Sequence, residues 1–391
     1  MSPLQLAYIS FDIVPDRKGS ATHIQAFAET LGNTLGTLQL VTVSPTEKTI
    51  PPQEIGNNII QTQLPAVGEH LIQRVQYFRS MLGKWWQGKY FDIVQFRSIY
   101  EGFPIACHKE NLCRYLIFEV NGLPSIELKY RYPKVASDRE LLYKLHRQEQ
   151  ICLEAADGIV TPSQVTKNYL QSRHIPPEKI RVIPNGVDLE TFSYTSPPPA
   201  THTLRLLYFG TLAGWQGVKV AVDAIALAKA EIPVSLQIIG KYRSRQLRDL
   251  QKRIRKRKIQ ESVSILPSVS QSELVAWLHE VDATMVPLTA CDRNITQGCC
   301  PLKILEAMAA GTPVIASNLA VVRELGSHEE EFLLVKPGSA KDIKEAMLRL
   351  YGETGLRERL ASNARKRVED TYTWQQAGEK LVEVYRQVLS V

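Results

Sequence analysis

The sequence CCPLKILEAMAAGTPVIAS, residues 299–317, predicts a short helix followed by a buried strand. Pro301 suits the start of a helix because its ring fixes φ and because it has no N–H group to leave without a partner. Gly311 suits the left-handed residue that ends many helices. We therefore expect a loop, a helix from Pro301, a turn at Gly311 and a strand over residues 312–317.

The two faces of this helix differ in chemistry. At about 100° per residue, one face carries the larger apolar residues, namely Leu302, Ile304, Leu305, Met308 and Ala309. The other face carries Lys303, Glu306, Ala307 and Ala310. Two charges among methyl groups leave room for a ligand, and the N–H groups at a helix start bind phosphate well. A nucleotide is therefore the first candidate ligand.

Length and composition indicate a globular protein of two domains, or at most three. The chain has 391 residues, of which 44% are hydrophobic and 22% charged. It has no apolar run near the roughly 18–20 residues that span a bilayer, and its start, MSPLQLAYIS, lacks the basic residues of a signal peptide. We expect a cytoplasmic location. The six cysteines form no C-x-x-C pair, so we expect reduced thiols rather than disulfides or a zinc site.

The net charge of +7 is concentrated in one segment. Residues 241–258 contain ten basic residues and one acid, a local charge of +9, so the rest of the chain sums to −2. Two interpretations stay open: a helix face exposed to water, or a surface that contacts an anionic membrane or another polyanion.

A second segment, residues 70–89, mixes basic and aromatic residues at roughly helical spacing. It fits a helix lying in a membrane interface, at the inner face of the membrane. It also fits a helix whose aromatic residues pack in the core, and this interpretation is slightly favoured.

Strands and helices alternate along the chain, which predicts parallel sheets. The first domain opens with a strand at residues 4–10, a glycine-bearing loop at 11–22 and a helix from His23 to about Leu35. The proline-rich stretch at 196–203 has the composition of a linker, after which the alternation restarts. We therefore expect domains at residues 1–195 and 204–373, and a final helix at 374–391 that packs on the second domain or crosses back to the first.

Five stretches together resemble the retaining glycosyltransferases of family 4. They are the glycine loop near residue 19, EAADGIVTPSQVTKNYL, VIPNGVD at 182–188, GTLAGWQG at 210–217 and PLKILEAMAAGTPVIAS at 301–317. The resemblance implies the GT-B fold, in which two Rossmann-like, doubly wound α/β domains face each other across a cleft. The first would bind the acceptor and the second the nucleotide sugar, as a co-substrate rather than a cofactor.

The resemblance also implies residue roles. Glu306 would hold the ribose hydroxyls, and N–H groups near Pro301, Leu302 and Lys303 would hold the diphosphate. The predicted catalytic residues are Glu306, Lys303 and His23. The predicted donor site comprises Gly210, Thr211, Gly214, Trp215, Gln216, Gly217, Gly298, Cys300, Pro301, Leu302, Lys303 and Glu306. The predicted acceptor site comprises Gly19, Ser20, Ala21, His23, Arg97, Glu119 and Asn121.

The sequence departs from the family at three of these positions. Gly298 stands where relatives carry a first glutamate, and Thr211 and Gln216 stand where they carry an arginine and a lysine that clamp the diphosphate. Lys303 is a candidate to supply the missing positive charge.

Simpler interpretations of the same residues stay open. Glu306 fits an ordinary helix glutamate paired with Lys303, and Gly214 and Gly217 fit a turn without a ligand. His23 fits a surface histidine, while Arg97, Glu119 and Asn121 fit local hydrogen bonding as well as ligand binding.

The sequence favours a hexosyltransferase that uses a UDP- or GDP-sugar and a lipid, lipid-linked or saccharide acceptor, with retention of configuration. We expect no catalytic metal, because no cluster of aspartates or histidines has ligand spacing. The alternatives are a nucleotide-binding protein of this fold that has lost turnover, or a basic module that binds polyanions or membranes. Nucleic acid is the least favoured partner, since residues 241–258 lack interleaved aromatic side chains.

Overall fold

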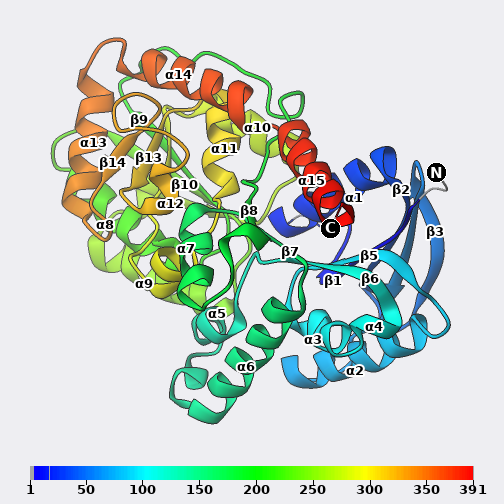
Figure 1. The fold of residues 1–391 in the computed structure, drawn as a ribbon. Helices are drawn as coiled ribbons and strands as arrows, with labels where there is room; N and C mark the ends of the chain where they lie inside the picture. Colours follow the sequence, from blue (N-terminus) through cyan, green and yellow to red (C-terminus); the bar gives the residue numbers. More distant parts are fainter. Residues whose placement is uncertain (1–3, 17, 391) are drawn as a thin grey trace. The chain divides into compact units, whose positions relative to one another are not determined.

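The computed structural model describes residues 4–16 and 18–390, which form two compact units (Figure 1). Unit 1 contains the chain up to Pro184 together with the segment that begins at Trp374. Unit 2 is Asn185–Thr373. Each unit is built on one sheet with helices on both faces, so the predicted pair of doubly wound α/β units is confirmed.

Unit 1 contains an eight-stranded sheet in the order β3-β4-β2-β1-β5-β6-β7-β8. Its strands are β1 (Leu4–Ile13), β2 (Gly36–Val43), β3 (Ile50–Gly56), β4 (Ile59–Leu64), β5 (Phe91–Phe96), β6 (Cys113–Glu119), β7 (Gly158–Thr161) and β8 (Ile180–Val182). All neighbours pair in parallel except β3 and β4, which are antiparallel. The strand order reverses between β1 and β5, and ligands of such sheets bind at the carboxyl ends of the strands beside this reversal.

Helices cover both faces of the sheet of unit 1. They are α1 (Gly19–Thr34), α2 (Leu71–Trp85), α3 (Ile99–Cys107), α4 (Lys109–Leu112), α5 (Pro124–Arg131), α6 (Arg139–Ala155), α7 (Gln164–Ser172) and α15 (Trp374–Leu389), with 3₁₀ turns η1 (Pro133–Ser137) and η2 (Pro177–Lys179). Strand β1 is apolar on both sides, as a strand between two helical layers must be. Leu6 and Tyr8 pack towards α1 and α15, while Ala7 and Ile9 pack towards α2 and α3.

Unit 2 contains a six-stranded, fully parallel sheet in the order β11-β10-β9-β12-β13-β14. Its strands are β9 (Leu204–Phe209), β10 (Val234–Ile239), β11 (Val263–Leu266), β12 (Ala283–Val286), β13 (Val314–Ser317) and β14 (Leu333–Val335). The order reverses between β9 and β12. The loops that follow these two strands therefore lie at the position where ligands of such sheets bind.

The helices of unit 2 include the one predicted from the opening motif. They are α8 (Val218–Ala228), α9 (Ser244–Arg257), α10 (Gln271–Glu280), α11 (Leu302–Ala310), α12 (Ala320–Arg323), α13 (Ala340–Gly352) and α14 (Leu356–Thr371), with short turns η3 (Gly214–Gln216), η4 (Gln260–Ser262) and the π-helical η5 (Arg293–Gln297). Pro301 precedes the first residue of α11, and Gly311 ends it in the left-handed region with φ 82°. The motif folds as loop, helix, turn and strand, as predicted.

The division between the units falls at Pro184 and Asn185 rather than in the proline-rich stretch at 196–203. The chain before the prolines already bonds to unit 2. The Asn185 side-chain amide donates to the Cys300 carbonyl oxygen at 2.7 Å, and the Thr195 N–H donates to the Ala310 carbonyl oxygen at 3.1 Å. The last helix, α15, groups with unit 1, where it packs against α1.

The two basic segments pack on their units by apolar faces. In α2, Val75, Phe78 and Leu82 are buried in the core of unit 1, whereas Ile72 and Tyr77 stay exposed. Among the aromatic residues of α2, Phe78 therefore belongs to the core and the partly buried Trp85 packs against it.

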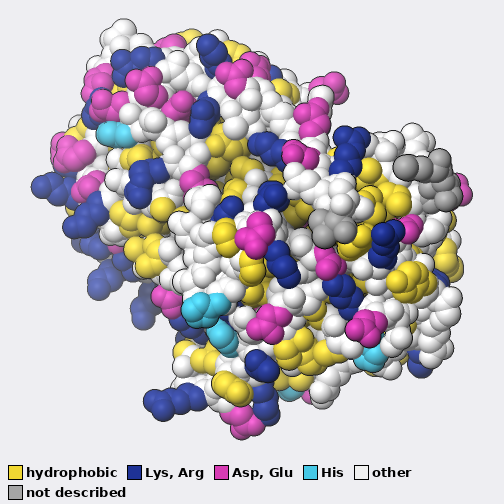
Figure 2. Space-filling model, in the orientation of Figure 1, with side chains coloured by type: hydrophobic (Ala, Val, Ile, Leu, Met, Phe, Trp, Pro, Cys, Tyr) yellow, Lys and Arg dark blue, Asp and Glu magenta, His cyan; other side chains and the backbone are white. Residues whose placement is uncertain are grey.

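Helix α9 buries Leu250 and Ile254, and its Arg253 and Arg257 both pair with Asp223 of α8. The other basic side chains of residues 241–258 are exposed. Figure 2 shows Lys and Arg side chains gathered over the part of unit 2 that carries α8 and α9.

Candidate functional site

The candidate donor site of unit 2 forms where the loop after β9 meets the start of α11. Lys303 points inward from the first turn of α11, and its ammonium donates a hydrogen bond to Gln216 Oε1 at 2.5 Å. The same ammonium lies 4.7 Å from the centroid of the Tyr208 ring and is nearly buried. The structure thus brings together two of the sequence-predicted stretches, 210–217 and 298–306.

Gly210 leaves the space that the Lys303 side chain occupies. Its φ of +118° favours glycine, and a Cβ atom there would lie 2.9 Å from Lys303 Nζ. Gly217 has a different reason to lack a side chain, since a Cβ atom would lie 1.7 Å from the Pro287 carbonyl oxygen. Gly217 therefore joins the loop after β9 to the loop after β12, which supports the turn interpretation for this glycine.

The second face of α11 is less open than its sequence suggests. Ala307 and Ala310 are buried along with Lys303, and Glu306 is partly exposed. The chain at Tyr194 and Thr195 packs over Gly311, which closes the end of this face. The part that remains near solvent is the start of the helix, with Pro301, Leu302 and Glu306.

Burial shifts the ionisation of both charged residues towards neutrality. It lowers the pKa of the Lys303 ammonium to about 7, against the attraction of Glu306, and the positive charge of Arg293 lowers that pKa further. Burial likewise raises the pKa of the Glu306 carboxyl to about 7, which Lys303 opposes. Both groups therefore change charge near neutral pH, and an anionic ligand would favour the charged form of Lys303.

The loop after β12 is fixed to the loop after β9 through Trp215. The Trp215 carbonyl oxygen accepts hydrogen bonds from Thr289 N at 3.0 Å and from Asn294 Nδ2 at 3.1 Å. The Arg293 guanidinium stacks 3.8 Å from the centroid of the Trp215 ring. These contacts hold the loop after β9 and the segment after β12 in fixed positions relative to each other.

The remaining predicted donor residues belong to the loop after β9 and to the segment that leads into α11. Thr211 and Gly214 are exposed, and the Thr211 carbonyl oxygen accepts from Tyr208 Oη at 2.7 Å. Gly298 follows η5, and its N–H donates to the Arg293 carbonyl oxygen at 3.1 Å. Cys300 is buried, while Pro301 and Leu302 are partly exposed at the start of α11.

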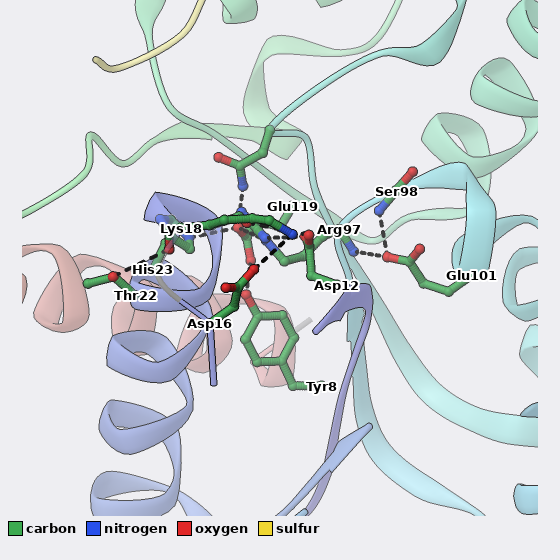
Figure 3. A network of polar contacts seen from close by, with 12 residues as sticks. Tyr8, Asp12, Asp16, Lys18, Thr22, His23, Arg97, Ser98, Glu101 and Glu119 are labelled. Atoms are coloured by element: carbon green, nitrogen blue, oxygen red, sulfur yellow. Dashed lines mark hydrogen bonds and ion pairs between the residues drawn. The ribbon is translucent and has the colours of Figure 1, made fainter. Parts of the chain in front are cut away.

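Unit 1 holds a second polar cluster, centred on Glu119 at the carboxyl end of β6 (Figure 3). Its oxygen Oε1 lies 2.7 Å from His23 Nε2 and accepts from Arg97 Nε at 2.8 Å and from the Asn121 side-chain amide. Its oxygen Oε2 accepts from Tyr8 Oη at 2.6 Å and from Gln95 Nε2 at 2.7 Å. The structure therefore brings His23, Arg97, Glu119 and Asn121 together, as the sequence predicted for an acceptor site.

The charge of Glu119 is held firmly. Burial would raise the pKa of its carboxyl, but Arg97 and His23 lower it more, so this pKa lies well below its usual range. The negative charge of Glu119 in turn holds the pKa of Arg97 above its usual range, although burial opposes this. A carboxylate offers about four lone-pair positions, and five donors surround this one. The arrangement favours local hydrogen bonding over ligand contact for Glu119.

The other predicted acceptor residues lie at the start of α1. This helix begins at Gly19, so the predicted start at His23 is wrong and Gly19, Ser20 and Ala21 form its first turn. Ser20 Oγ donates to Asp12 Oδ1 at 3.4 Å, and Asp12 also pairs with Arg97 Nη1 at 3.3 Å. Ala21 is buried, and Gly19 is exposed. The first turn of α1 and the Glu119 cluster therefore share one edge of the sheet.

Sequence reasoning missed several members of both clusters. In unit 1 these are Tyr8, Gln95 and Tyr385, whose hydroxyl donates to Gln95 Oε1 at 2.8 Å. A polar Gln95 inside the apolar strand FDIVQF was a usable signal, because buried polar groups require partners. Arg293, which stacks on Trp215, lies in a loop without such a signal.

Across residues 4–16 and 18–390, no three His, Cys, Asp or Glu side chains are grouped so that they could hold a metal ion. Within those same residues, no helix is both long and apolar enough to cross a membrane.

Comparison with known proteins connects both units to one family. Residues 17–191 match the family described as Glycosyltransferase Family 4, and residues 203–353 match Glycosyl transferases group 1. The chain is 28% identical over 258 residues to D-inositol 3-phosphate glycosyltransferase of Jonesia denitrificans, covering 61% of this chain and 58% of that relative. The chain thus spans less than two thirds of the length of such curated relatives.

Solved structures share the fold over nearly the whole chain. Sucrose-phosphate synthase from Thermosynechococcus elongatus superposes with a TM-score of 0.82 at 20% identity, covering 98% of this chain and 99% of that one. Anabaena HepE in complex with UDP and glucose gives a TM-score of 0.73 at 16% identity, with coverage of 98% and 99%. The predicted GT-B fold is confirmed by these likenesses.

Proposed function

Because the chain belongs to family 4 of the glycosyltransferases, we propose that it transfers a hexose from a nucleotide sugar to an acceptor with retention of configuration. We further propose a UDP- or GDP-sugar as donor and a lipid, lipid-linked or saccharide acceptor. A UDP-sugar is favoured by analogy, since the related structure HepE was determined with UDP-glucose.

One observation carries the proposal: the ammonium of Lys303 lies against the loop after β9, bonded to Gln216. This places a cation beside the N-terminus of α11, next to the point where the strand order reverses. A diphosphate bound there would meet a positive charge and unpaired helix N–H groups together. Glu306, on the same exposed part of the helix, would hold the ribose hydroxyls.

The chemistry follows from these positions. The bond between the anomeric carbon and the diphosphate oxygen breaks, and Lys303 and the helix N-terminus stabilise the charge that develops on the leaving group. The acceptor hydroxyl attacks from the same face, forms the new glycosidic bond and gives its proton to the departing phosphate. In unit 1, His23 would contact the acceptor, in an orientation held by Glu119.

The proposal is tested by calorimetric titration of UDP, GDP, ADP and their hexose conjugates into the wild type and Glu306→Ala. We expect one nucleotide to bind saturably and to lose about tenfold in affinity in the variant, the order expected for removing a hydrogen-bond partner. Lys252→Ala, which removes an exposed charge of α9, is the matched control and should bind like the wild type. No binding of any nucleotide by the wild type would overturn the proposal.

A second candidate is a nucleotide-binding protein without turnover, which Gly298 favours because relatives carry a glutamate there. It predicts nucleotide binding but no release of hexose from a labelled donor, with any acceptor or with water. Measurable transfer or hydrolysis, lost in Glu306→Ala, would exclude it.

A further inference from the structure

Helix α9 has a face packed on unit 2 and, opposite to it, a face of basic residues. Leu250 and Ile254 belong to the core of unit 2, and Arg253 and Arg257 beside them pair with Asp223 of α8. At about 100° per residue, five further basic residues fall on the opposite side of the helix, within an arc of about 100°. This basic face consists of Arg245, Arg248, Lys252, Arg255 and Lys256.

The charges of the basic face are directed to solvent rather than to other side chains. All five side chains are exposed, and across residues 4–16 and 18–390 none of them makes an ion pair or a side-chain hydrogen bond. Asp249 is the one acid within α9. Lys and Arg side chains stand out together on this part of unit 2 (Figure 2). Like charges three or four residues apart destabilise a helix, so folding alone gives no reason for this row.

An anionic bilayer suits the basic face better than nucleic acid does. Helix α9 contains no aromatic residue on which bases could stack. Its buried apolar side chains pack in the core, so the basic face offers charge without an apolar anchor. Anionic lipids diffuse within a bilayer and can gather beneath a row of cations about 16 Å long, whereas the phosphates of a duplex have a fixed spacing.

We propose that the basic face of α9 binds the surface of a bilayer that contains anionic phospholipids, by charge alone and without insertion. The inference goes beyond the proposed function and does not depend on it, because it concerns a surface of unit 2 that contains none of the donor-site residues. Such binding is reversible and sensitive to salt, since the Debye length falls from about 10 Å at 0.1 M salt to about 3 Å at 1 M.

The test measures co-sedimentation of the full chain with phosphatidylcholine vesicles that contain or lack phosphatidylglycerol. One variant changes all five residues of the basic face to Gln. A control variant changes five exposed cations on other helices to Gln and so removes the same net charge. The control residues are Lys341, Arg359, Lys366, Lys380 and Arg386. Circular dichroism checks that both variants fold, which we expect because every changed side chain is exposed.

We expect the wild type and the control variant to bind the phosphatidylglycerol vesicles at low salt. The partition coefficient of the α9 variant should be lower by about 100-fold or more, because each basic residue near an anionic surface contributes roughly fivefold. Glycerol phosphate in solution should not displace the protein, since one headgroup meets only part of the row.

Four results would overturn the inference. They are no binding of the wild type at low salt, an equal loss in the control and α9 variants, binding that persists at about 1 M salt, and displacement by glycerol phosphate. Tighter binding to a DNA or RNA duplex than to the vesicles at the same salt would overturn it too, and would assign the basic face to nucleic acid. Each of these results leaves the proposed function standing, because nucleotide titration tests that function separately.

Discussion

The two polar clusters of this protein differ in how they affect buried charge: one stabilises the ionised form of its carboxylate, and the other favours the neutral forms of its two charged residues. In unit 1, Glu119 is ionised and enclosed by five donors, and its charge is matched by Arg97. In unit 2, the pKa values of Lys303 and Glu306 are both moved to about 7, so neither holds its charge firmly. The first cluster is complete as it stands, whereas Lys303 of the second becomes fully charged only when an anionic ligand binds. The difference separates a cluster whose charges are already paired from one whose charges are poorly paired.

The largest expected effect is on the stability of unit 1. Glu119→Gln would leave Arg97 buried without its main counter-charge, so we expect the free energy of unfolding to fall by about 3–5 kcal/mol. Urea unfolding at pH 7 measures it. Glu29→Gln makes the same change at an exposed position of α1 and should alter stability by less than about 0.5 kcal/mol.

The same variant has a pH signature. The folded pKa of Glu119 is lowered from the ordinary 4.5, so its stabilisation is present above that pH and is lost as the pH falls below it. The difference in free energy of unfolding between the wild type and Glu119→Gln should therefore become smaller as the pH falls. A gap that stays constant down to pH 3 would contradict the assigned charge.

The second prediction concerns unit 2, where we expect a substitution to raise the free energy of unfolding rather than lower it. Lys303→Met should stabilise the unliganded protein by about 1–4 kcal/mol below pH 7, because a buried, poorly paired charge is replaced by an apolar side chain. The folded pKa of Lys303 is about 7 against 10.5 unfolded, so the gain should shrink as the pH rises between these values. Thermal unfolding from pH 6 to pH 10 checks this. If Lys303→Met were less stable than the wild type at pH 6, the proposed contrast between the two clusters would be wrong.

The third prediction concerns proton uptake on ligand binding. A bound diphosphate raises the pKa values of Lys303 and Glu306 from about 7, so nucleotide binding near pH 7.5 should take up about 0.5–1 proton. Titrations in buffers of different ionisation enthalpy measure the uptake. Glu306→Gln and Lys303→Met divide it between the two groups, and zero uptake by the wild type would show that neither titrates with the ligand.

The smallest effect is expected on the exposed basic face of α9. The double change Arg255→Ala and Lys256→Ala should alter stability by less than about 0.5 kcal/mol, since both side chains face water. Binding to vesicles rich in phosphatidylglycerol, measured at rising salt, tests the membrane interpretation. Equal binding by wild type and variant would assign this charge to solubility alone.

The sequence predicted the elements of this fold better than their contacts. The helical spacing of apolar residues, together with Gly311 at the end of the segment, predicted α11. Both signals are local properties of the sequence. Strands β3, β4 and β14 were not predicted; β3 contains two prolines, the apolar pattern of β4 is interrupted by Gln61, Thr62 and Gln63, and β14 has only three residues.

The candidate sites were predictable as groups of loops but not as contacts. The sequence assigned Arg97 and Glu119 to the ends of strands, but it did not identify them as partners of each other. That Lys303 turns towards Gln216, and that Tyr385 reaches Gln95, depend on tertiary packing between distant segments. In both cases a polar residue lies at a buried position and therefore needs a partner. That partner can be identified only from the three-dimensional fold.

The position of α15 has a consequence for the order in which the protein is made. Trp374 packs on the His23 ring at 5.5 Å between centroids, and Tyr385 bonds to Gln95 in the centre of the first sheet. During synthesis, unit 2 emerges from the ribosome in full before α15 does, since it ends at Thr373. The first unit to be translated is therefore the last to be completed, and its polar cluster stays unfinished until the final helix arrives.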